Sequence, residues 1–437
     1  MYIGSLAETV TGKTPRVWLS TGKEQVTAIV GKRGSGKSFT LGVVLEGLTA
    51  GPDSPVGRQV SERAVLLFDP LDIYWTTRLT VAPSDNAEAQ RHYGMAKAAG
   101  LDGLEFAVDA WIPGVASRRV TDPAWFSELA LAVPSLGIEE WELLLGVNVA
   151  QEPMGQALAD ALDLVRSQGY QFAGGRVEPT ATFGMDELAS ALSADELAGV
   201  YHAETLRALR QRLRGLSATG LFDSVGTRIQ TILTAGRAAV ILLNRLPQSY
   251  RDVVVSVLTR MVIETRSSTA FAEKRLALEG GLDAATREQL VEAVAYGLPR
   301  TVVMLDEGQT FLSPGAGSPV RELFVRLVKE GRNMGLSAII ATQQPSALDK
   351  RILSQVETFV AHQSVTEQDV RAVRENLKAP VADSMQFGAQ TLDDSALLRQ
   401  LPPGVCLVSS ADMNSTPRRA IIVSVRPRAT VHGGIEI

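Results

Sequence analysis

The sequence predicts an α/β fold in which a parallel sheet core is interrupted by an all-helical insertion. Short apolar runs, typical of parallel strands buried on both faces, lie at residues 26–30, 64–68, 238–243 and 301–305. Helical patterns separate these runs, and strands that alternate with helices favour a parallel sheet. The segment 121–215 differs, because it is rich in Leu, Ala and Glu and has apolar residues at helical spacing.

These patterns divide the chain into three parts. We expect N-terminal strands and the first part of the core in residues 1–120 and the helical insertion in 121–215. The second part of the core and a C-terminal tail follow in 216–437. Further strands are expected at residues 104–108, 337–341, 358–362, 405–409 and 420–425.

The most specific motif is GKRGSGKS at residues 31–38, which matches the phosphate-binding pattern G-x-x-x-x-G-K-[ST] at every position. A predicted strand precedes it and a predicted helix follows, as the motif requires. Its glycines let backbone N–H groups surround phosphate oxygens, and the helix N-terminus favours anions. We therefore expect ATP here, with Lys37 at the β and γ phosphates and the Ser38 hydroxyl on Mg²⁺. The expected nucleotide contacts are Gly31, Gly34, Ser35, Gly36, Lys37, Ser38 and Phe39.

A second motif, at residues 302–307, joins an apolar strand to an acidic pair, Asp306 and Glu307. The end of such a strand places Asp306 beside the phosphates, where it holds a water bound to Mg²⁺. Glu307 is then placed to activate the attacking water as a general base. A strand ending in a polar turn would look the same, but the phosphate loop earlier in the chain favours the catalytic interpretation.

Gln343 and Arg332 each have a catalytic and a structural interpretation. Gln343 ends a predicted strand, where a polar side chain can sense the γ phosphate; the alternative is a turn broken by Pro345. Arg332 ends a predicted helix just before the same strand. There it can project from its own subunit and stabilise charge in a neighbour's site. The alternative is that Arg332 only complements the helix dipole.

Two other segments stay open between function and structure. Arg207, Arg210 and Arg214 share one face of a helix in the insertion. Such a face suits either phosphate contact or a solvated, partner-binding surface. Residues 313–319, rich in Ser, Pro and Gly, are either a pore loop or a plain surface loop.

Composition restricts the class of protein. No apolar run approaches the roughly 18–20 residues that cross a bilayer, and no secretion signal is visible. The single cysteine, Cys406, excludes an internal disulfide, and the four histidines show no zinc spacing. We therefore expect a cytoplasmic protein without a membrane partner. The net charge of −5 argues against a uniformly basic DNA-coating surface but allows a basic channel.

Taken together, these motifs resemble those of the HerA/FtsK superfamily of ring-forming ATPases, and most of all its HerA branch. The stretches that carry the resemblance are GKRGSGKS, VLLFDPLDIYW, RTVVMLDEGQTFL, VKEGRNMGLSAIIATQQPSALDKRILSQVETFV and RPRATVHGG. The resemblance implies a P-loop NTPase core of the RecA-like type. It also implies that Lys37 and Ser38 bind nucleotide and Mg²⁺, and that Asp306 and Glu307 form the acidic pair.

The resemblance extends to the mode of action. Arg332 is similar to the family's arginine that acts on the adjacent subunit, and Gln343 to its γ-phosphate sensor. The implied protein is a homohexameric ATPase that translocates on double-stranded DNA. Its implied partner is a nuclease or another effector, in DNA end processing or antiviral defence.

Three departures from the family pattern bear on this expectation. The phosphate loop begins at Gly31, so we expect at most a strand or two of the usual N-terminal barrel domain. The family's Asp-Pro-x-Gly-Glu-Tyr reads Asp-Pro-Leu-Asp-Ile-Tyr at 69–74, and its Thr-Gln-Arg-Pro reads Thr-Gln-Gln-Pro at 342–345. The alternative function is an ATP-binding ring scaffold that assembles and regulates an effector without pumping DNA. A conjugation or secretion motor is disfavoured, because it needs a membrane anchor.

Overall fold

A computed structural model describes residues 1–7, 14–57, 62–114, 125–315, 318–379, 385–387, 390–413 and 419–434. The chain divides into two compact units. The first unit comprises Met1–Asp109, Leu233–Asn244 and Val262–Ile437, and the second comprises Ala110–Ile232 and Arg245–Met261.

The main sheet has twelve strands among the described residues. In sheet order they are β2 (Arg16–Trp18), β1 (Tyr2–Leu6), β18 (Ile421–Val425), β17 (Val405–Ser410), β14 (Thr358–Ala361), β3 (Val26–Val30), β13 (Leu336–Thr342), β12 (Thr301–Leu305), β4 (Ala64–Asp69), β11 (Ala238–Leu242), β5 (Val108–Pro113) and β6 (Phe126–Leu129). The pairs from β14 to β11 are parallel, whereas β17, β18, β1 and β2 add antiparallel pairs at one edge. The expected α/β fold with a mainly parallel sheet is confirmed.

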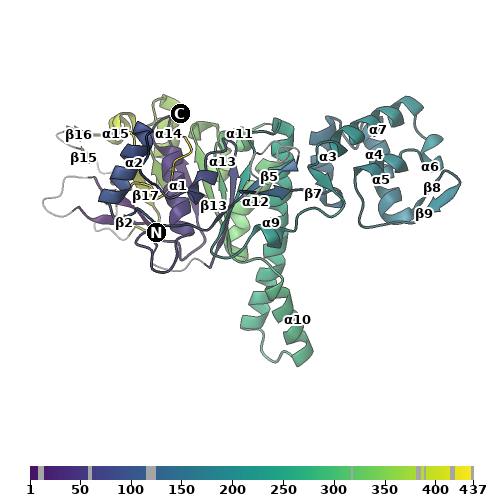
Figure 1. The fold of residues 1–437 in the computed structure, drawn as a ribbon, viewed down its shortest axis with the longest axis horizontal. Coiled ribbons are helices and arrows are strands. Elements are labelled where there is room, and N and C mark those ends of the chain that lie inside the picture. Colours follow the sequence, from purple (N-terminus) through teal and green to yellow (C-terminus); the bar gives the residue numbers. More distant parts are fainter. Residues whose placement is uncertain are drawn as a thin grey trace. The chain divides into compact units, whose positions relative to one another are not determined.

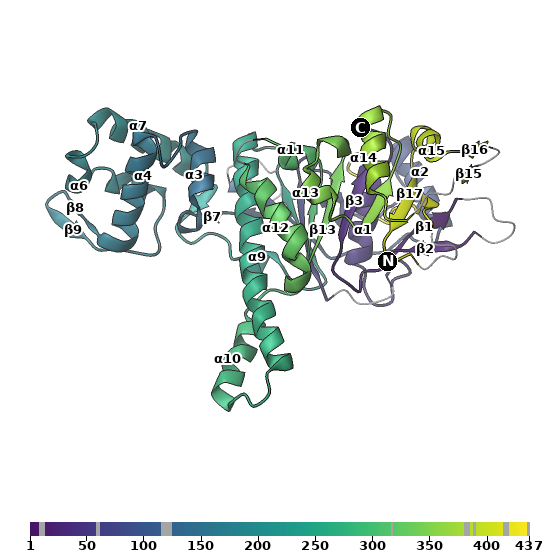
Figure 2. The same cartoon turned by 180° about the vertical axis from the view of Figure 1, so that it is seen from behind.

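The central strands are buried on both faces, which explains why they read as unbroken apolar runs. All residues of β3, β4, β12 and β13 are buried. Helices α1 (Lys37–Leu48) and α12 (Pro319–Met334) cover opposite faces of the sheet (Figures 1 and 2). Because these strands are parallel, their carboxyl ends meet at one edge, and the phosphate loop and the acidic pair both follow there.

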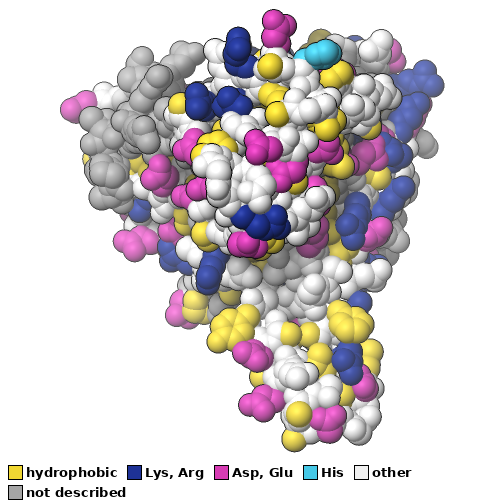
Figure 3. Space-filling model, turned by 90° about the vertical axis from the view of Figure 1, so that its right-hand side faces the viewer, with side chains coloured by type: hydrophobic (Ala, Val, Ile, Leu, Met, Phe, Trp, Pro, Cys, Tyr) yellow, Lys and Arg dark blue, Asp and Glu magenta, His cyan; other side chains and the backbone are white. Residues whose placement is uncertain are grey.

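A helical hairpin extends the first unit. The second half of α9 (Gln248–Leu278) and α10 (Ala284–Ala295) lie side by side in Figures 1 and 2. Phe271, Leu278, Val291 and Tyr296 are exposed on it, and Figure 3 shows hydrophobic side chains on this surface.

The remaining elements of the first unit are short. They are η1 (Trp75–Arg78), α2 (Ala87–Ala98), α11 (Gln309–Leu312), η5 (Pro345–Ala347), α13 (Lys350–Leu353), α14 (Glu367–Asn376), α15 (Asp394–Gln400) and the pair β15 (Met385–Phe387) and β16 (Gln390–Leu392). Among the described residues, no helix has the length and apolar character needed to cross a membrane.

The second unit contains most of the predicted insertion and is largely helical. Its helices are α3 (Ile138–Leu145), α4 (Pro153–Asp163), η4 (Leu164–Gln168), α5 (Met185–Ala191), α6 (Asp195–Ala198), α7 (Ala203–Ser217) and α8 (Ile229–Ile232), with η3 (Val133–Ser135) before them. Leu206, Leu209 and Leu213 of α7 are buried, as their helical spacing predicts. The expected start of the insertion, residue 121, lies outside the described residues.

The expectation of an entirely helical insertion is wrong in one detail, because residues 126–177 also contain short strands. Strand β7 (Leu131–Ala132) pairs with β10 (Phe222–Asp223), and β8 (Tyr170–Phe172) pairs with β9 (Gly175–Val177). The β8–β9 turn places Ala173 and Gly174 at φ 51° and 80°. Two adjacent positive φ values close a tight hairpin, and a composition rich in Leu and Ala does not reveal such a turn.

One predicted strand is displaced. We expected a strand at 104–108, but β5 occupies Val108–Pro113, where Ala110, Trp111 and Ile112 are buried. The strands expected at 337–341, 358–362, 405–409 and 420–425 are confirmed within one or two residues.

Two segments that the sequence left open are partly described. The side chains of Arg210 and Arg212 donate to the carbonyls of Leu192 and Leu145 within the second unit, at 3.1 and 2.6 Å. These bonds favour a structural role for some of the arginines of α7. In the loop 313–319, residues 316–317 lie outside the described part of the chain, and its role stays a prediction.

Candidate nucleotide-binding site

The phosphate loop connects β3 to α1 through three glycines in conformations that other residues rarely adopt. Gly31, Gly34 and Gly36 have φ values of 155°, 77° and 103°. A Cβ atom on Gly31 would lie 2.6 Å from both the Cβ of His362 and the Oγ of Ser35. The loop is anchored where the backbone N–H of Lys32 donates to the carbonyl of Gln363 at 2.8 Å. The motif therefore folds into a loop with the conformation expected of a phosphate cradle.

His362 packs against this loop, and no motif in the sequence pointed to it. Its Nε2 lies 2.9 Å from the Thr40 hydroxyl of α1, and its Nδ1 lies 3.1 Å from the Val405 carbonyl of β17. Because a carbonyl can only accept, Nδ1 carries the proton and Nε2 accepts from Thr40. Burial lowers the pKa of His362 to about 4, aided by the charge of Lys37. His362 is thus a neutral link between α1 and β17.

Lys37 and the acidic pair converge at the carboxyl edge of the sheet. The Lys37 ammonium lies 2.7 Å from Oδ1 of Asp306 and 3.2 Å from Oε1 of Glu307. All three side chains are buried or nearly so. Burial by itself would lower the pKa of Lys37, but the charges of Asp306 and Glu307 outweigh it and raise that pKa. The two motifs, 269 residues apart, therefore form one site.

The predicted Mg²⁺ ligands also lie together. The Ser38 hydroxyl is 3.4 Å from Oδ2 of Asp306, so two oxygen ligands converge beside the phosphate loop. The Lys37 ammonium on the carboxylates shows that this position attracts a cation. Hydroxyl and carboxylate oxygens suit Mg²⁺, which keeps several waters when protein ligands are few. Within the described residues, no larger cluster of His, Cys, Asp and Glu that could hold a metal is present.

Glu307 is held by two glutamine side chains. Gln343, at the end of β13, donates from Nε2 to Oε1 of Glu307 at 2.8 Å. Gln309 donates from Nε2 to the other oxygen, Oε2. Gln309 is itself oriented by the Thr342 hydroxyl, which donates to its Oε1 at 2.7 Å. Sequence reasoning identified Gln343 and missed Gln309, although Gln309 lies only two residues after Glu307.

The backbone of Glu307 is strained. Its φ is 51°, in the left-handed region that a glutamate rarely adopts. Such residues typically cost about 1–3 kcal/mol and persist only where the surroundings impose them. Here the backbone N–H of Glu307 donates to Oδ1 of Asp306 at 2.8 Å. The strained turn thus joins the two acidic residues and aims both toward Lys37.

Phe39 lies in the first turn of α1 and contacts two histidine rings. The centroids of His432 and His92 lie 5.6 and 5.8 Å from that of Phe39, both at 75°. Burial and the nearby Arg428 lower the pKa of His432 to about 3, so this ring is neutral. Neither histidine was identified from the sequence, because both lie far from Phe39 along the chain.

The segment Asp69–Tyr74 brings a tyrosine to the acidic pair. The family glycine in its pattern falls on Asp72, whose φ is 55°. Tyr74 then lies fully buried, and its hydroxyl donates to Oδ2 of Asp306 at 2.7 Å. Burial raises the pKa of Asp69 to about 8, against the opposing effect of bonds from the backbone of Tyr74 and Leu71. The segment matches part of the family pattern, but the sequence predicted no role for Tyr74.

Arg332 lies elsewhere. It is exposed in the last turn of α12, at the amino end of β13, whereas Gln343 follows the carboxyl end of that strand. Seven strand residues at ~3.3 Å each separate the two positions by about 20 Å. The side chain of Arg332 makes no hydrogen bond or ion pair with any other described residue. It therefore does not reach the phosphate loop of its own chain.

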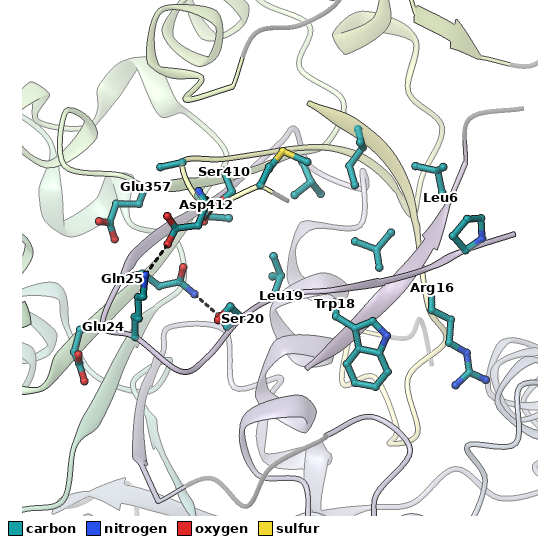
Figure 4. A pocket seen from close by; sticks show the side chains of 18 of the residues that line it. Leu6, Arg16, Trp18, Leu19, Ser20, Glu24, Gln25, Glu357, Ser410 and Asp412 are labelled. Carbon is teal, nitrogen blue, oxygen red and sulfur yellow. Dashed lines mark hydrogen bonds and ion pairs between the residues drawn. The ribbon is translucent and has the colours of Figure 1, made fainter. Parts of the chain in front are cut away.

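Arg332 lines a cavity of about 640 Å³ at this edge of the sheet. Figure 4 shows Glu24, Gln25, Glu357 and Asp412 at one end of the cavity and Leu6 and Trp18 at the other. A second cavity of about 360 Å³, which Arg332 also lines, lies against the base of the α9–α10 hairpin. The cavities around Arg332 are thus separate from the nucleotide site.

Known proteins resemble this chain in sequence. It is 26% identical over 201 residues to the DNA double-strand break repair helicase HerA of Pyrococcus furiosus, a match that covers 44% of this chain and 35% of that protein. It is 24% identical over 153 residues to the protein of the same name from Sulfurisphaera tokodaii, covering 34% and 27%. The chain thus spans about a third of the length of the curated relatives it matches.

Solved structures and a family model extend the comparison. VirB4 of Thermoanaerobacter pseudethanolicus matches with a TM-score of 0.49 and 15% identity, over 96% of both chains. The bacterial conjugative coupling protein TrwB matches with a TM-score of 0.46 and 11% identity, over 94% of this chain and 86% of that one. The model of the family described as "Helicase HerA, central domain" matches residues 15–262, more than half of the chain. With its phosphate loop, acidic pair and parallel sheet, the chain belongs to this family of HerA-like P-loop ATPases.

Proposed function

We propose that this protein is the ATP-hydrolysing subunit of a homohexameric ring that translocates on double-stranded DNA. The observation that carries the proposal is the convergence of Lys37, Ser38, Asp306 and Glu307 at one edge of the sheet. This arrangement supplies a cation for the phosphates, oxygen ligands for Mg²⁺ and a carboxylate for water activation.

The hydrolytic step assigns one task to each of these residues. Lys37 exchanges the carboxylates for the β and γ phosphates when ATP binds. Glu307 then accepts a proton from the attacking water at a carboxylate oxygen, while Gln343 and Gln309 hold that carboxylate in place. Mg²⁺, held by Ser38 and Asp306, would neutralise charge on the phosphate oxygens. Gln343, close to Glu307, is also placed to sense the γ phosphate.

The neighbouring subunit supplies the remaining positive charge. Arg332 lies about 20 Å from its own site by strand length, is exposed, and has no partner among the described residues. An arginine so placed suits the site of an adjacent subunit, where it stabilises charge on the transferred phosphate. ATP would then bind between subunits, which couples hydrolysis to movement within the ring.

The similarity to two proteins named DNA double-strand break repair helicase HerA supports a DNA substrate, whereas the partner is proposed from the family resemblance of the motifs. We propose double-stranded DNA in the ring and a nuclease or another effector as partner, in DNA end processing or antiviral defence. The alternative is a ring scaffold that binds ATP and regulates an effector without pumping DNA. The net charge of −5 favours this alternative to some extent.

One experiment separates the two functions. ATP hydrolysis is measured with and without linear double-stranded DNA at a fixed salt concentration, because salt screens phosphate contacts. A motor requires stimulation of at least several-fold, and Glu307→Gln should abolish it while ATP still binds. Hydrolysis that is indifferent to DNA would support the scaffold, and full hydrolysis by Glu307→Gln would exclude this general base.

A further inference from the structure

We propose that Tyr74 is a positioning residue that fixes the Asp306 carboxylate for a Mg²⁺–nucleotide complex, an inference that rests on the proposed ATPase function. The hydroxyl of Tyr74 donates to Oδ2 of Asp306 at 2.7 Å, and both side chains are completely buried at 0% exposure. A buried hydrogen bond to a charged acceptor is among the stronger kinds in proteins. Contacts on two sides hold the tyrosine in this place.

The turn that carries Tyr74 is fixed from the sheet side by Asp69. The backbone N–H of Tyr74 donates to one carboxylate oxygen of Asp69 at 2.8 Å, and that of Leu71 to the other at 3.1 Å. Asp69 is the last residue of β4, which pairs with β12 just before Asp306. The turn therefore leaves one strand and returns its tyrosine to the end of the adjacent strand.

A C-terminal segment, residues 426–434, fixes the turn from the other side, and we call it the strap. The hydroxyl of Thr76, in η1, donates to the carbonyls of Ile73 and Val431, each at 2.8 Å. Backbone bonds from Val81 to Ala429 and from Val431 to Leu79 continue the contact at 3.1 and 2.8 Å. The strap thus lies along residues 76–81, which follow Tyr74.

The strap is itself anchored to α1, the helix that begins at Lys37. Arg426 pairs with Glu46 at 2.6 Å, and both side chains are completely buried. The backbone N–H and hydroxyl of Thr430 donate to the other oxygen of Glu46 at 3.0 and 2.6 Å. Arg428 adds a bond of 2.8 Å to the Thr77 hydroxyl. The helix of the phosphate loop, the strap and the Tyr74 turn are therefore one connected network.

The two carboxylate oxygens of Asp306 accept hydrogen bonds from different donors. Oδ1 accepts from Lys37 and from the backbone of Glu307, at 2.7 and 2.8 Å. Oδ2 accepts from Tyr74, and more weakly from Ser38 at 3.4 Å. When Ser38 turns to the metal, Tyr74 is the donor that still orients Oδ2. Donors behind a metal ligand typically change metal affinity or activity by 10–100-fold when removed.

The test measures binding of a non-hydrolysable ATP analogue, AMP-PNP, to the full chain as a function of Mg²⁺ concentration. For Tyr74→Phe we expect the Mg²⁺ concentration at half-maximal binding to rise about tenfold. Binding in EDTA should stay unchanged, because the groups that the Tyr74 hydroxyl meets, Asp306 and the Ser38 hydroxyl, are the predicted Mg²⁺ ligands. Tyr201→Phe is the matched control, because its hydroxyl also donates to a carboxylate, that of Asp160, at 2.6 Å but in the second unit. This control should leave both measurements unchanged.

Ser38→Ala separates failure of this inference from failure of the proposed function. If Ser38→Ala raises the Mg²⁺ requirement and Tyr74→Phe does not, Tyr74 has no positioning role and the ATPase proposal stands. If neither variant changes the Mg²⁺ requirement, the metal site itself is wrongly assigned. Tighter Mg²⁺ binding by Tyr74→Phe would also overturn the inference, since Tyr74 would then compete with the metal. Thr76→Val, which loosens the strap, should shift the requirement in the same direction by a smaller factor and carries the test if Tyr74→Phe does not fold.

Discussion

At the carboxyl edge of the central sheet, charged side chains are buried and paired, whereas at the amino edge Arg332 is exposed and has no partner among the described residues. The Lys37 ammonium pairs with both Asp306 and Glu307, at distances of 2.7 and 3.2 Å. A buried charge without a partner would be very costly, so Lys37 needs its carboxylate partners within the same chain. An exposed arginine has no such requirement. One edge is therefore suited to hold a ligand, and the other is free to act on a neighbour.

Removal of the cation from the buried edge should have the largest effect. Lys37→Ala should abolish nucleotide binding or hydrolysis, because the phosphates lose their ammonium and two buried carboxylates lose their partner. Equilibrium binding of ATP and steady-state turnover measure this. Lys329→Ala, an exposed lysine on α12, is the control. Normal turnover in Lys37→Ala would show that the buried edge is not the catalytic one.

The exposed edge should be almost as sensitive, but only through a neighbour. Arg332→Ala should lower kcat about 10³-fold while ATP binding is retained, as for other arginines supplied from an adjacent subunit. Arg326→Ala, on the same helix and paired with Glu330, should change little.

Mixing two inactive variants sharpens the contrast between the edges. Lys37→Ala and Arg332→Ala subunits, combined in one preparation, should regain part of the hydrolysis, because some interfaces then contain both intact residues. An equal loss without any recovery on mixing would place Arg332 in a structural role.

His362, which lies at the buried edge, should make the stability of the protein depend on pH. The pKa of His362 is lowered to about 4 in the folded chain, from an ordinary value of 6.5. The unfolded chain therefore binds the proton first, and the stability contributed by neutral His362 is present above pH 6.5 and is lost as the pH falls toward 4. Between pH 7.5 and 5 the loss amounts to about 2 kcal/mol.

Chemical denaturation at these two pH values measures the effect of His362. His362→Asn, whose amide can still donate to Val405, should remove this part of the pH dependence of unfolding. The exposed His202→Asn should leave it unchanged. An identical pH slope in wild type and His362→Asn would mean that the ring is not buried neutral.

The smallest effect is expected for Gln343, one of the two side chains that hold the base Glu307. Gln343→Ala should lower kcat about tenfold, because Glu307 loses the bond from Gln343 but keeps the one from Gln309. The neighbouring Gln344, exposed beyond the strand end, provides the control in Gln344→Ala. A loss as large as that of Glu307→Gln would assign Gln343 a direct role at the γ phosphate.

The local sequence determined those elements whose conformation depends on neighbouring residues. The glycines of residues 31–38 specify a loop of positive φ values, and unbroken apolar runs such as 301–305 specify strands buried on both faces. Even the meeting of Lys37 with Asp306 followed from sequence, because parallel strands bring their carboxyl ends together. The β8–β9 hairpin was missed, since its turn depends on two positive φ values that Ala173 does not announce.

Tertiary structure alone decided the parts that support the site. The Tyr74–Asp306 bond joins residues 232 apart, the His362–Thr40 bond 322 apart and the Arg426–Glu46 bond 380 apart. Nothing in the local sequence of either partner indicates that the two will meet, and only the order of the strands and the path of the strap bring each pair together. The reactive residues of a motif are encoded at neighbouring positions in the sequence. The orientation of their side chains depends on hydrogen bonds between buried polar groups that lie far apart in the sequence.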